Sequence, residues 1–210
     1  MKSGLLVGIG VVILFLIGCG DGDVVIQEDP DVQLENDSIA IAEYMSEKGY
    51  ENYSTTPSGV RYLILDEGTG DPIDESDIVT FDYIGILLND TIFDTTVKAV
   101  GDSIRAHFLE DSVGLADKTV HETFLALYYE DKIYSPLTYT YSVSGWTIDE
   151  QFIQGFTDGI TVTFNQMNVG GKAIIALPSA IAYGTRGSGL LIDPNTPITF
   201  ELYPISVTKQ

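Results

Sequence analysis

The sequence contains few of the residues on which common enzyme chemistries depend. Its 210 residues include one cysteine and two histidines, His107 and His121. A single cysteine excludes an intrachain disulfide, and the His-Glu pair at 121–122 has no second histidine four residues on, as a zinc protease motif requires. The glycine-rich stretch 183–191 has no lysine and no following helix, which argues against a phosphate-binding loop. No catalytic triad or cysteine–histidine pair is evident either, so we expect no metal, no cofactor and no covalent nucleophile.

Basic residues are also scarce. The chain has 31 acidic and 10 basic residues, for a formal net charge of −21. A field of this sign repels phosphate backbones, so no nucleic-acid partner is expected. The simplest explanation of the acidity is a well-solvated surface. Residues 71–77 hold four carboxylates but lack the glycine and final glutamate of a calcium loop, so we interpret them as a polar turn.

The apolar run at 5–17 is shorter than the ~20 residues needed to cross a bilayer. It follows Lys2 and ends in Leu16-Ile17-Gly18-Cys19, which is the place and length of a secretory signal. The ending resembles the lipobox of bacterial lipoproteins, whose cysteine is diacylated and becomes the first residue after cleavage. This resemblance implies a signal peptide over 1–18 and a lipid on Cys19. The alternatives are an uncleaved N-terminal membrane anchor or a buried core cysteine.

A lipid on Cys19 would place the mature protein outside the cytoplasm, bound to a membrane of the bacterial cell envelope at the outer membrane or the periplasmic face. Residues 20–37 are rich in acidic residues, with Asn36, Gly22 and Pro30 among them, which is typical of a flexible tether. Ser38 can cap a short helix over 38–48, and Gly49 can end it. We therefore interpret 19–56 as a lipid-anchored linker with a short helix. Thr56-Pro57-Ser58-Gly59 marks its end.

Beyond the linker, apolar alternation and turn residues predict a domain built mainly of strands. The strands are expected at 60–64, 78–88, 91–94, 136–141, 173–177 and 198–202. A capping box at Thr119-x-x-Glu122 predicts a helix over about 120–130, and 152–164 reads as a second helical stretch interrupted by Gly155 and Gly159. The pattern indicates an α+β fold with an antiparallel sheet and one or two helices.

Five segments, in order, resemble the FKBP-type peptidyl-prolyl cis-trans isomerases. They are SGVRYLILDEGTG (58–70), VTFDYIGILLNDTIFDTT (79–96), PLTYTY (136–141), FIQGFTDGI (152–160) and MNVGGKAIIALPSAIAYGTRGSGLLIDPNTPITFEL (167–202). The resemblance implies a twisted antiparallel β-sheet wrapped over a short α-helix, with an apolar pocket between them. It covers a domain at 57–210 and leaves about 97–135 as an inserted helical segment.

The same resemblance implies which side chains form the pocket. Phe156 stands where the family has the tryptophan of the pocket floor. The hydroxyl of Tyr183 and the backbone N–H of Ile153 would bind the substrate carbonyl. Asp94 would support the rim. Without the resemblance, Asp94 could equally be a turn carboxylate, and the aromatic residues could be ordinary sheet core. The implied catalytic residues are Tyr83, Phe93, Asp94, Ile153, Phe156, Tyr183 and Phe200, and the implied substrate-binding residues are Leu137, Phe152, Leu191 and Ile192.

These residue types suit the isomerisation of X–Pro bonds. Rotation faces a barrier of about 18–20 kcal/mol because the amide is resonance-stabilised. An apolar site weakens that charge-separated resonance and can bind the twisted amide without proton transfer at the reacting bond. The sequence thus predicts a prolyl isomerase acting on proline-containing polypeptides of the envelope. A non-catalytic chaperone or protein-binding module on the same fold is the alternative, and nothing in the sequence indicates an oligomeric state.

Overall fold

The computed structural model describes residues 29–110, 125, 128–130, 132–140 and 153–210. The predicted lipobox with Cys19, the capping box of the inserted segment and Phe152 lie outside these residues. Among the helices of the described ranges, none combines the length and the apolar character needed to cross a membrane.

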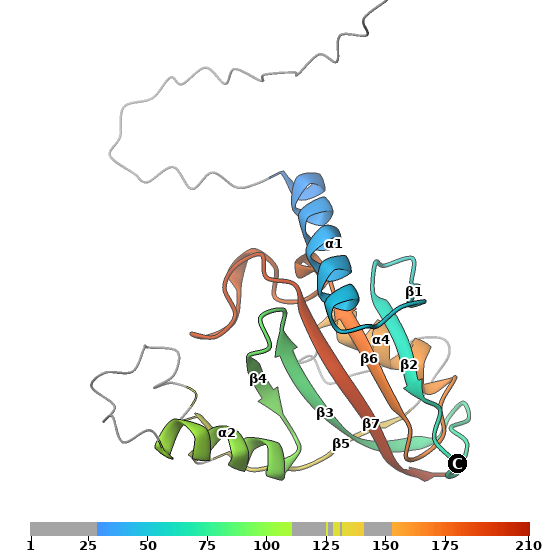
Figure 1. Ribbon diagram of the computed structural model, residues 1–210. Helices are drawn as coiled ribbons and strands as arrows, with labels where there is room; N and C mark the ends of the chain where they lie inside the picture. Colours follow the sequence, from blue (N-terminus) through green and yellow to red (C-terminus); the bar gives the residue numbers. More distant parts are fainter. Residues whose placement is uncertain (1–28, 111–124, 126–127, 131, 141–152) are drawn as a thin grey trace, which may run out of the picture.

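A seven-stranded antiparallel sheet is the centre of the fold (Figure 1). Its order is β1-β2-β6-β7-β3-β4, and β5 also pairs with β3. Each predicted strand is present. The strands are β1 (Ser54–Thr55), β2 (Arg61–Asp66), β3 (Ile78–Leu87), β4 (Ile92–Thr95), β5 (Leu137–Thr140), β6 (Lys172–Leu177) and β7 (Ile198–Thr208). The predicted fold class is confirmed.

The outer edge of β3 is shared by two strands. β4 pairs with its second half, from Ile84 to Ile86, and β5 pairs with its first half, from Ile78 to Phe81. The chain therefore leaves the sheet after Thr95 and returns beside the same strand at Leu137. A long insertion at this split leaves every other strand pair intact.

One face of the sheet packs on α4 (Gln154–Phe164). The predicted interruption of this helix at its glycines is wrong, and the reason is packing. A Cβ atom on Gly159 would lie 2.5 Å from Ile175 Cδ1, and one on Gly155 would lie 2.8 Å from Leu177 Cδ2. The glycines thus allow the helix to approach β6 closely, and Phe81 meets Phe164 edge-on at 5.2 Å between ring centroids.

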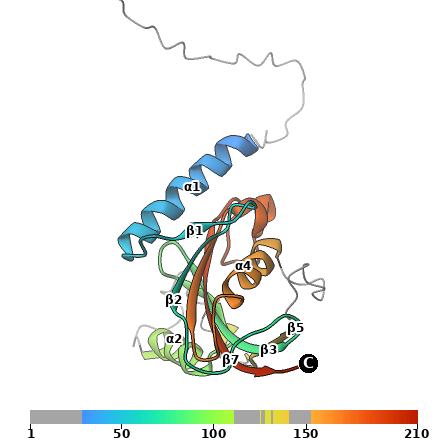
Figure 2. The same cartoon turned by 90° about the vertical axis from the view of Figure 1, so that its right-hand side faces the viewer.

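The opposite face is covered by α1 (Pro30–Glu47) (Figures 1 and 2). The helix buries Ile41, Tyr44 and Met45 against Ile174 and Ala176 of β6. Successive β6 side chains point to opposite faces, so the residues alternating with these two pack toward α4.

This helix begins earlier than the sequence suggested. The prediction that 30–37 belong to a flexible tether is wrong: Asp29 caps the helix by accepting the Asp31 N–H, and Pro30 occupies the first turn, where its missing N–H costs nothing. The predicted boundary at 56 falls between β1 and β2, two strands that pair with each other.

The inserted segment, about 97–135, contains a helix that the sequence analysis missed. This is α2 (Lys98–Glu110), which includes Gly101, a poor helix former. A Cβ on Gly101 would lie 1.9 Å from the Tyr134 hydroxyl, so the glycine serves packing within the segment. Leu125 and residues 128–130 are helical, as predicted for 120–130.

Candidate functional site

A cavity of about 280 Å³ lies between α4, the strands β3, β4 and β7, and the loop that follows β6. Eight residues line it: the seven that were expected to be catalytic, and Leu137, which was expected to bind substrate. The lining residues are Tyr83, Phe93, Asp94, Leu137, Ile153, Phe156, Tyr183 and Phe200. The structure therefore brings together residues that lie more than a hundred positions apart in the chain.

Aromatic rings make the floor of this cavity. Phe156 is 3% exposed, and its ring centroid lies 4.6 Å from Phe200 and 5.6 Å from Tyr83. Phe93 meets Phe200 edge-on at 5.6 Å. Such contacts hold the rings in fixed orientations, because edge-on and tilted geometries match the charge distribution of aromatic rings. The floor is thus rigid and apolar.

Gly85 of β3 packs against two rings of the cavity, a position that the sequence analysis did not single out. A Cβ atom there would lie 2.6 Å from Phe93 Cζ and 3.0 Å from Phe200 Cε1. Any larger residue would displace the two rings. A glycine inside a strand pattern often marks such a close approach, and that signal could have identified it.

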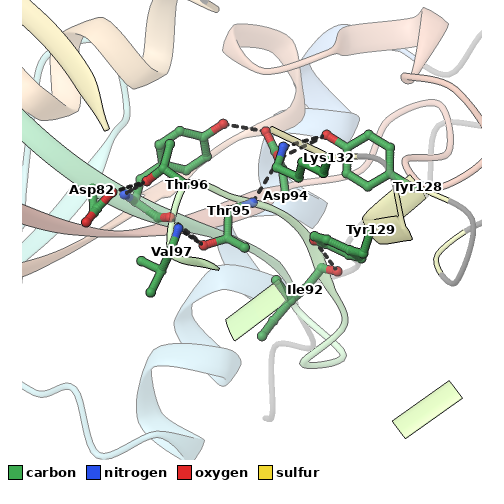
Figure 3. A network of polar contacts seen from close by, with 10 residues as sticks. Asp82, Ile92, Asp94, Thr95, Thr96, Val97, Tyr128, Tyr129 and Lys132 are labelled. Atoms are coloured by element: carbon green, nitrogen blue, oxygen red, sulfur yellow. Dashed lines mark hydrogen bonds and ion pairs between the residues drawn. The ribbon is translucent and has the colours of Figure 1, made fainter. Parts of the chain in front are cut away.

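Asp94 is the polar centre of the rim (Figure 3). The Tyr83 hydroxyl donates a hydrogen bond to its Oδ2. Its Oδ1 accepts the Thr95 N–H at 2.8 Å, the Tyr128 hydroxyl at 3.0 Å and the Lys132 ammonium at 2.5 Å. The carboxylate therefore binds four donors and orients the Tyr83 ring that lines the cavity.

Tyr128 and Lys132 belong to the inserted segment, and the sequence analysis assigned neither to the site. They are 34 and 38 positions from Asp94 in the chain. The only local signal was their own spacing of four residues, which suits the 3.0 Å hydrogen bond from Lys132 Nζ to the Tyr128 hydroxyl.

The ionisation states of the rim follow from burial and from these bonds. Burial raises the pKa of Tyr83, and the neighbouring Asp94 charge raises it further. Burial also raises the pKa of Tyr183. For Lys132 burial acts to lower the pKa, but the hydrogen bonds to Asp94 and Tyr128 outweigh it and raise the pKa. At neutral pH the hydroxyls are therefore neutral donors and Lys132 is a cation.

The loop from Pro178 to Pro197 supplies Tyr183 and a second wall. It contains η2 (Ser179–Ile181) and η3 (Gly184–Arg186). Three of its glycines adopt positive φ. At Gly187 there is also no room for a side chain, since a Cβ there would lie 2.2 Å from the Ile192 carbonyl oxygen. Two backbone hydrogen bonds, of 2.8 and 3.1 Å, join Ser188 and Ile192 within the loop.

Leu191 and Ile192, expected to bind substrate, line a second cavity of about 140 Å³. It adjoins the first cavity, because both are lined by Phe93, Asp94 and Tyr183. The remaining residues that line the second cavity are Tyr128, Ser188 and Gly189.

Ile153 stands immediately before α4. Its backbone is extended (φ −69°, ψ 143°), and its carbonyl oxygen accepts the Phe156 N–H at 3.1 Å. Ile153 therefore joins the first turn of the helix to the cavity that it lines. In the described residues we find no group of three or more histidine, cysteine or acidic side chains that could hold a metal.

Comparison with known proteins relates part of the chain to a known family. Residues 142–203 match the family model of the FKBP-type peptidyl-prolyl cis-trans isomerases. This stretch is therefore similar to part of an FKBP-type domain. Over 175 residues it is 28% identical to the outer membrane protein MIP of Legionella longbeachae, covering 83% of this chain and 55% of that protein. Over 72 residues it is 36% identical to the FK506-binding protein of Neisseria meningitidis serogroup A, covering 34% of this chain and 57% of that protein.

The chain thus spans about half the length of these relatives. Among solved structures, the peptidyl-prolyl cis-trans isomerase of Pseudomonas syringae pv. tomato is 22% identical, with a TM-score of 0.49 over 87% of this chain and 98% of that one. The FKBP-type match includes Ile153, Phe156, Tyr183 and Phe200. It does not include Tyr83, Phe93 or Asp94, which precede the inserted segment. These residues lie on β3 and β4, and the pairing of these strands in the sheet brings them to the same cavity.

Proposed function

We propose that this protein is a peptidyl-prolyl cis-trans isomerase. The observation that carries the proposal is the aromatic cavity of about 280 Å³ with one hydroxyl-bearing loop residue, Tyr183, at its edge. A rigid apolar floor accommodates the proline ring by shape. The FKBP-type match of residues 142–203 supports the same activity.

In the proposed mechanism the site acts on the amide without a nucleophile. The proline ring rests on Phe156, between Phe93 and Phe200, and the X–Pro amide loses its water shell. Since amide resonance separates charge, removing water weakens it and lowers the cost of twisting the bond. The Tyr183 hydroxyl and the Ile153 N–H bind the substrate carbonyl, and Leu137 extends the apolar contact. Tyr83, held by Asp94, keeps the remaining wall in place.

We further propose that the protein acts on proline-containing polypeptides in the bacterial cell envelope, where a lipid on Cys19 binds it to a membrane. The sequence Leu16-Ile17-Gly18-Cys19 supports this location. One of its relatives is named an outer membrane protein. Mass spectrometry of the membrane fraction tests it: an N-terminal peptide starting with diacylated Cys19 is expected, and an unmodified Cys19 in a chain starting at Met1 would contradict it.

The activity is tested with a prolyl-peptide isomerisation assay that needs no protease. Wild type is expected to accelerate the cis-to-trans reaction, and Tyr183→Phe to reduce kcat/KM about tenfold, because it removes one hydrogen bond to the carbonyl. Tyr62→Phe is the matched control, since Tyr62 packs on the same core without lining the cavity. Equal rates for Tyr183→Phe and Tyr62→Phe would refute the role of Tyr183.

A non-catalytic chaperone or binding module is the second candidate. It is favoured by the presence of Tyr128 and Lys132 on the rim, where they add a surface for a bound chain. Binding of prolyl peptides without any acceleration of their isomerisation would establish this second function in place of the first.

A further inference from the structure

The inserted segment contributes side chains to the site itself. Tyr128 lines the second cavity together with Leu191 and Ile192 of the loop after β6. Lys132 is only 15% exposed, and its ammonium lies 4.8 Å from the centroid of the Tyr128 ring as well as 2.5 Å from Asp94 Oδ1. An ammonium that bonds a phenol hydroxyl and is paired with a carboxylate is held in place (Figure 3). Lys132 therefore holds two residues that line this cavity, Tyr128 and Asp94.

The second cavity is sized and placed for one substrate side chain. Its volume of about 140 Å³ equals the space of roughly four or five waters, at ~30 Å³ each. Because it shares Phe93, Asp94 and Tyr183 with the aromatic cavity, a residue next to a bound proline lies at its entrance. Consecutive Cα atoms are only about 3–4 Å apart, so the side chain of that neighbour reaches into it.

The charge of this cavity depends on Lys132. Asp94 lines both cavities, and the molecule as a whole has a formal charge of −21. A carboxylate at this position, in such a field, would repel an acidic substrate residue. The ammonium of Lys132 offsets the Asp94 charge at a distance of 2.5 Å.

We propose that the inserted segment completes the substrate site: Tyr128 and Lys132 form a subsite for the residue that precedes the substrate proline, and Lys132 allows that residue to be acidic. This inference rests on the proposed function, since it names the residue preference of the same site. Tyr128 supplies an aromatic wall and a hydroxyl, and Lys132 sets the charge preference. The specificity of this protein then differs from that of an FKBP-type domain whose rim lacks an inserted cation.

The test compares peptides that differ only before proline, with Glu, Ala or Lys at that position, at low ionic strength. In wild type the Glu and Lys peptides are expected to have similar kcat/KM. Lys132→Met is expected to lower the ratio of kcat/KM for the Glu peptide to kcat/KM for the Lys peptide about fivefold, with the value for the neutral Ala peptide between the two. Lys132→Arg is expected to restore the ratio. Added salt is expected to reduce the effect, because the Debye length falls to about 3 Å at 1 M.

Lys98→Met is the matched control. It removes a lysine from the same inserted segment, but that lysine is exposed and pairs with Asp102, also on α2. An unchanged ratio in folded Lys132→Met, or an equal change in Lys98→Met, would overturn the inference while leaving the isomerase activity intact. If wild type accelerates no peptide, the proposed function fails. The dissociation constants of the three peptides then decide the subsite: the same fivefold change in their ratio supports it, and no change refutes it.

Discussion

Two phenylalanine rings at the floor of the cavity depend on the smallest residue in the sheet. The gap above Gly85 is filled by the edges of Phe93 and Phe200, so the position of both rings is set by a missing side chain. The same rings line the aromatic cavity. Gly85, which has no side chain, therefore controls the shape of the site.

Gly85→Ala is expected to displace these rings and to reduce both stability and activity. Overpacking of this kind typically costs about 1–3 kcal/mol of unfolding free energy. Gly159→Ala is the control, because its Cβ would meet Ile175 in the core at 2.5 Å, away from the cavity. In denaturant titrations both variants should lose stability, whereas only Gly85→Ala should weaken prolyl-peptide binding by severalfold. Equal binding by the two variants would show that ring placement does not control the site.

The hydroxyl and ammonium groups of the rim predict how stability changes with pH. The pKa values of Tyr83, Tyr128 and Tyr183 are raised from the ordinary 10.0, chiefly by burial. That of Lys132 is raised from 10.5, because its bonds to Asp94 and Tyr128 outweigh burial. A raised pKa means that the folded state holds its proton more tightly than the unfolded chain. The stability from these groups is fully present below the unfolded values and is lost as the pH rises through the folded values.

The melting temperature is therefore expected to change little between pH 7 and pH 9 on account of these groups, and to fall above pH 10. Tyr83→Phe should make the fall less steep, because it removes the ionisation of one buried hydroxyl. Thermal unfolding followed across this pH range, with tyrosinate absorbance recorded in parallel, measures both effects. Ionisation of Tyr83 near pH 8 would contradict the account.

At the scale of elements, α1 holds the loop that carries Tyr183. Asp37 is 2% exposed and accepts the Ser179 N–H at 2.7 Å and the Ser179 hydroxyl at 2.6 Å. Gln33 donates to Asp37 at 2.7 Å and to the Asn195 carbonyl at 3.3 Å. The helix is thus hydrogen-bonded to the loop near both ends of the loop.

Asp37→Ala is expected to leave the buried Ser179 N–H without its acceptor, which costs about 1–3 kcal/mol of unfolding free energy. The loosened loop should raise KM for prolyl peptides more than it lowers kcat. Glu43→Ala on the exposed side of α1 is the control. Amide exchange at Ser179 reports the loss directly. Unchanged exchange in Asp37→Ala would show that α1 does not secure the loop.

The elements also show what could be predicted from the sequence. Six of the seven strands could, because apolar alternation and turn residues are local signals. The exception is β1, which has only two residues, Ser54 and Thr55, and no such pattern. The length of α1 could not, since residues 30–37 are polar and their helix depends on Asp29, Pro30 and the contact of Asp37 with the loop. The residues of the aromatic cavity were predicted from the family resemblance. Tyr128 and Lys132 could not be predicted, because only the folded chain brings them to Asp94 across 34 and 38 positions.

The whole molecule is an antiparallel sheet with a helix on each face and a split outer edge. α4 packs on one face of the sheet and α1 covers the other (Figure 2). The aromatic cavity lies on the α4 side, lined by Phe156 of α4 and by residues of β3, β4 and β7. The inserted segment leaves at the split between β4 and β5, which places it beside the rim that Asp94 occupies. The topology therefore allows an addition to the site without any change to the sheet.

The most direct test of the central claim is exchange NMR on an Ala-Pro peptide, recorded with wild-type protein at a small fraction of the peptide concentration. Uncatalysed exchange takes tens to hundreds of seconds. We predict cis–trans exchange cross-peaks on the sub-second timescale, together with shifts of the Phe93, Phe156 and Phe200 ring resonances as the peptide is added. Uncatalysed exchange in the presence of folded protein would contradict the account.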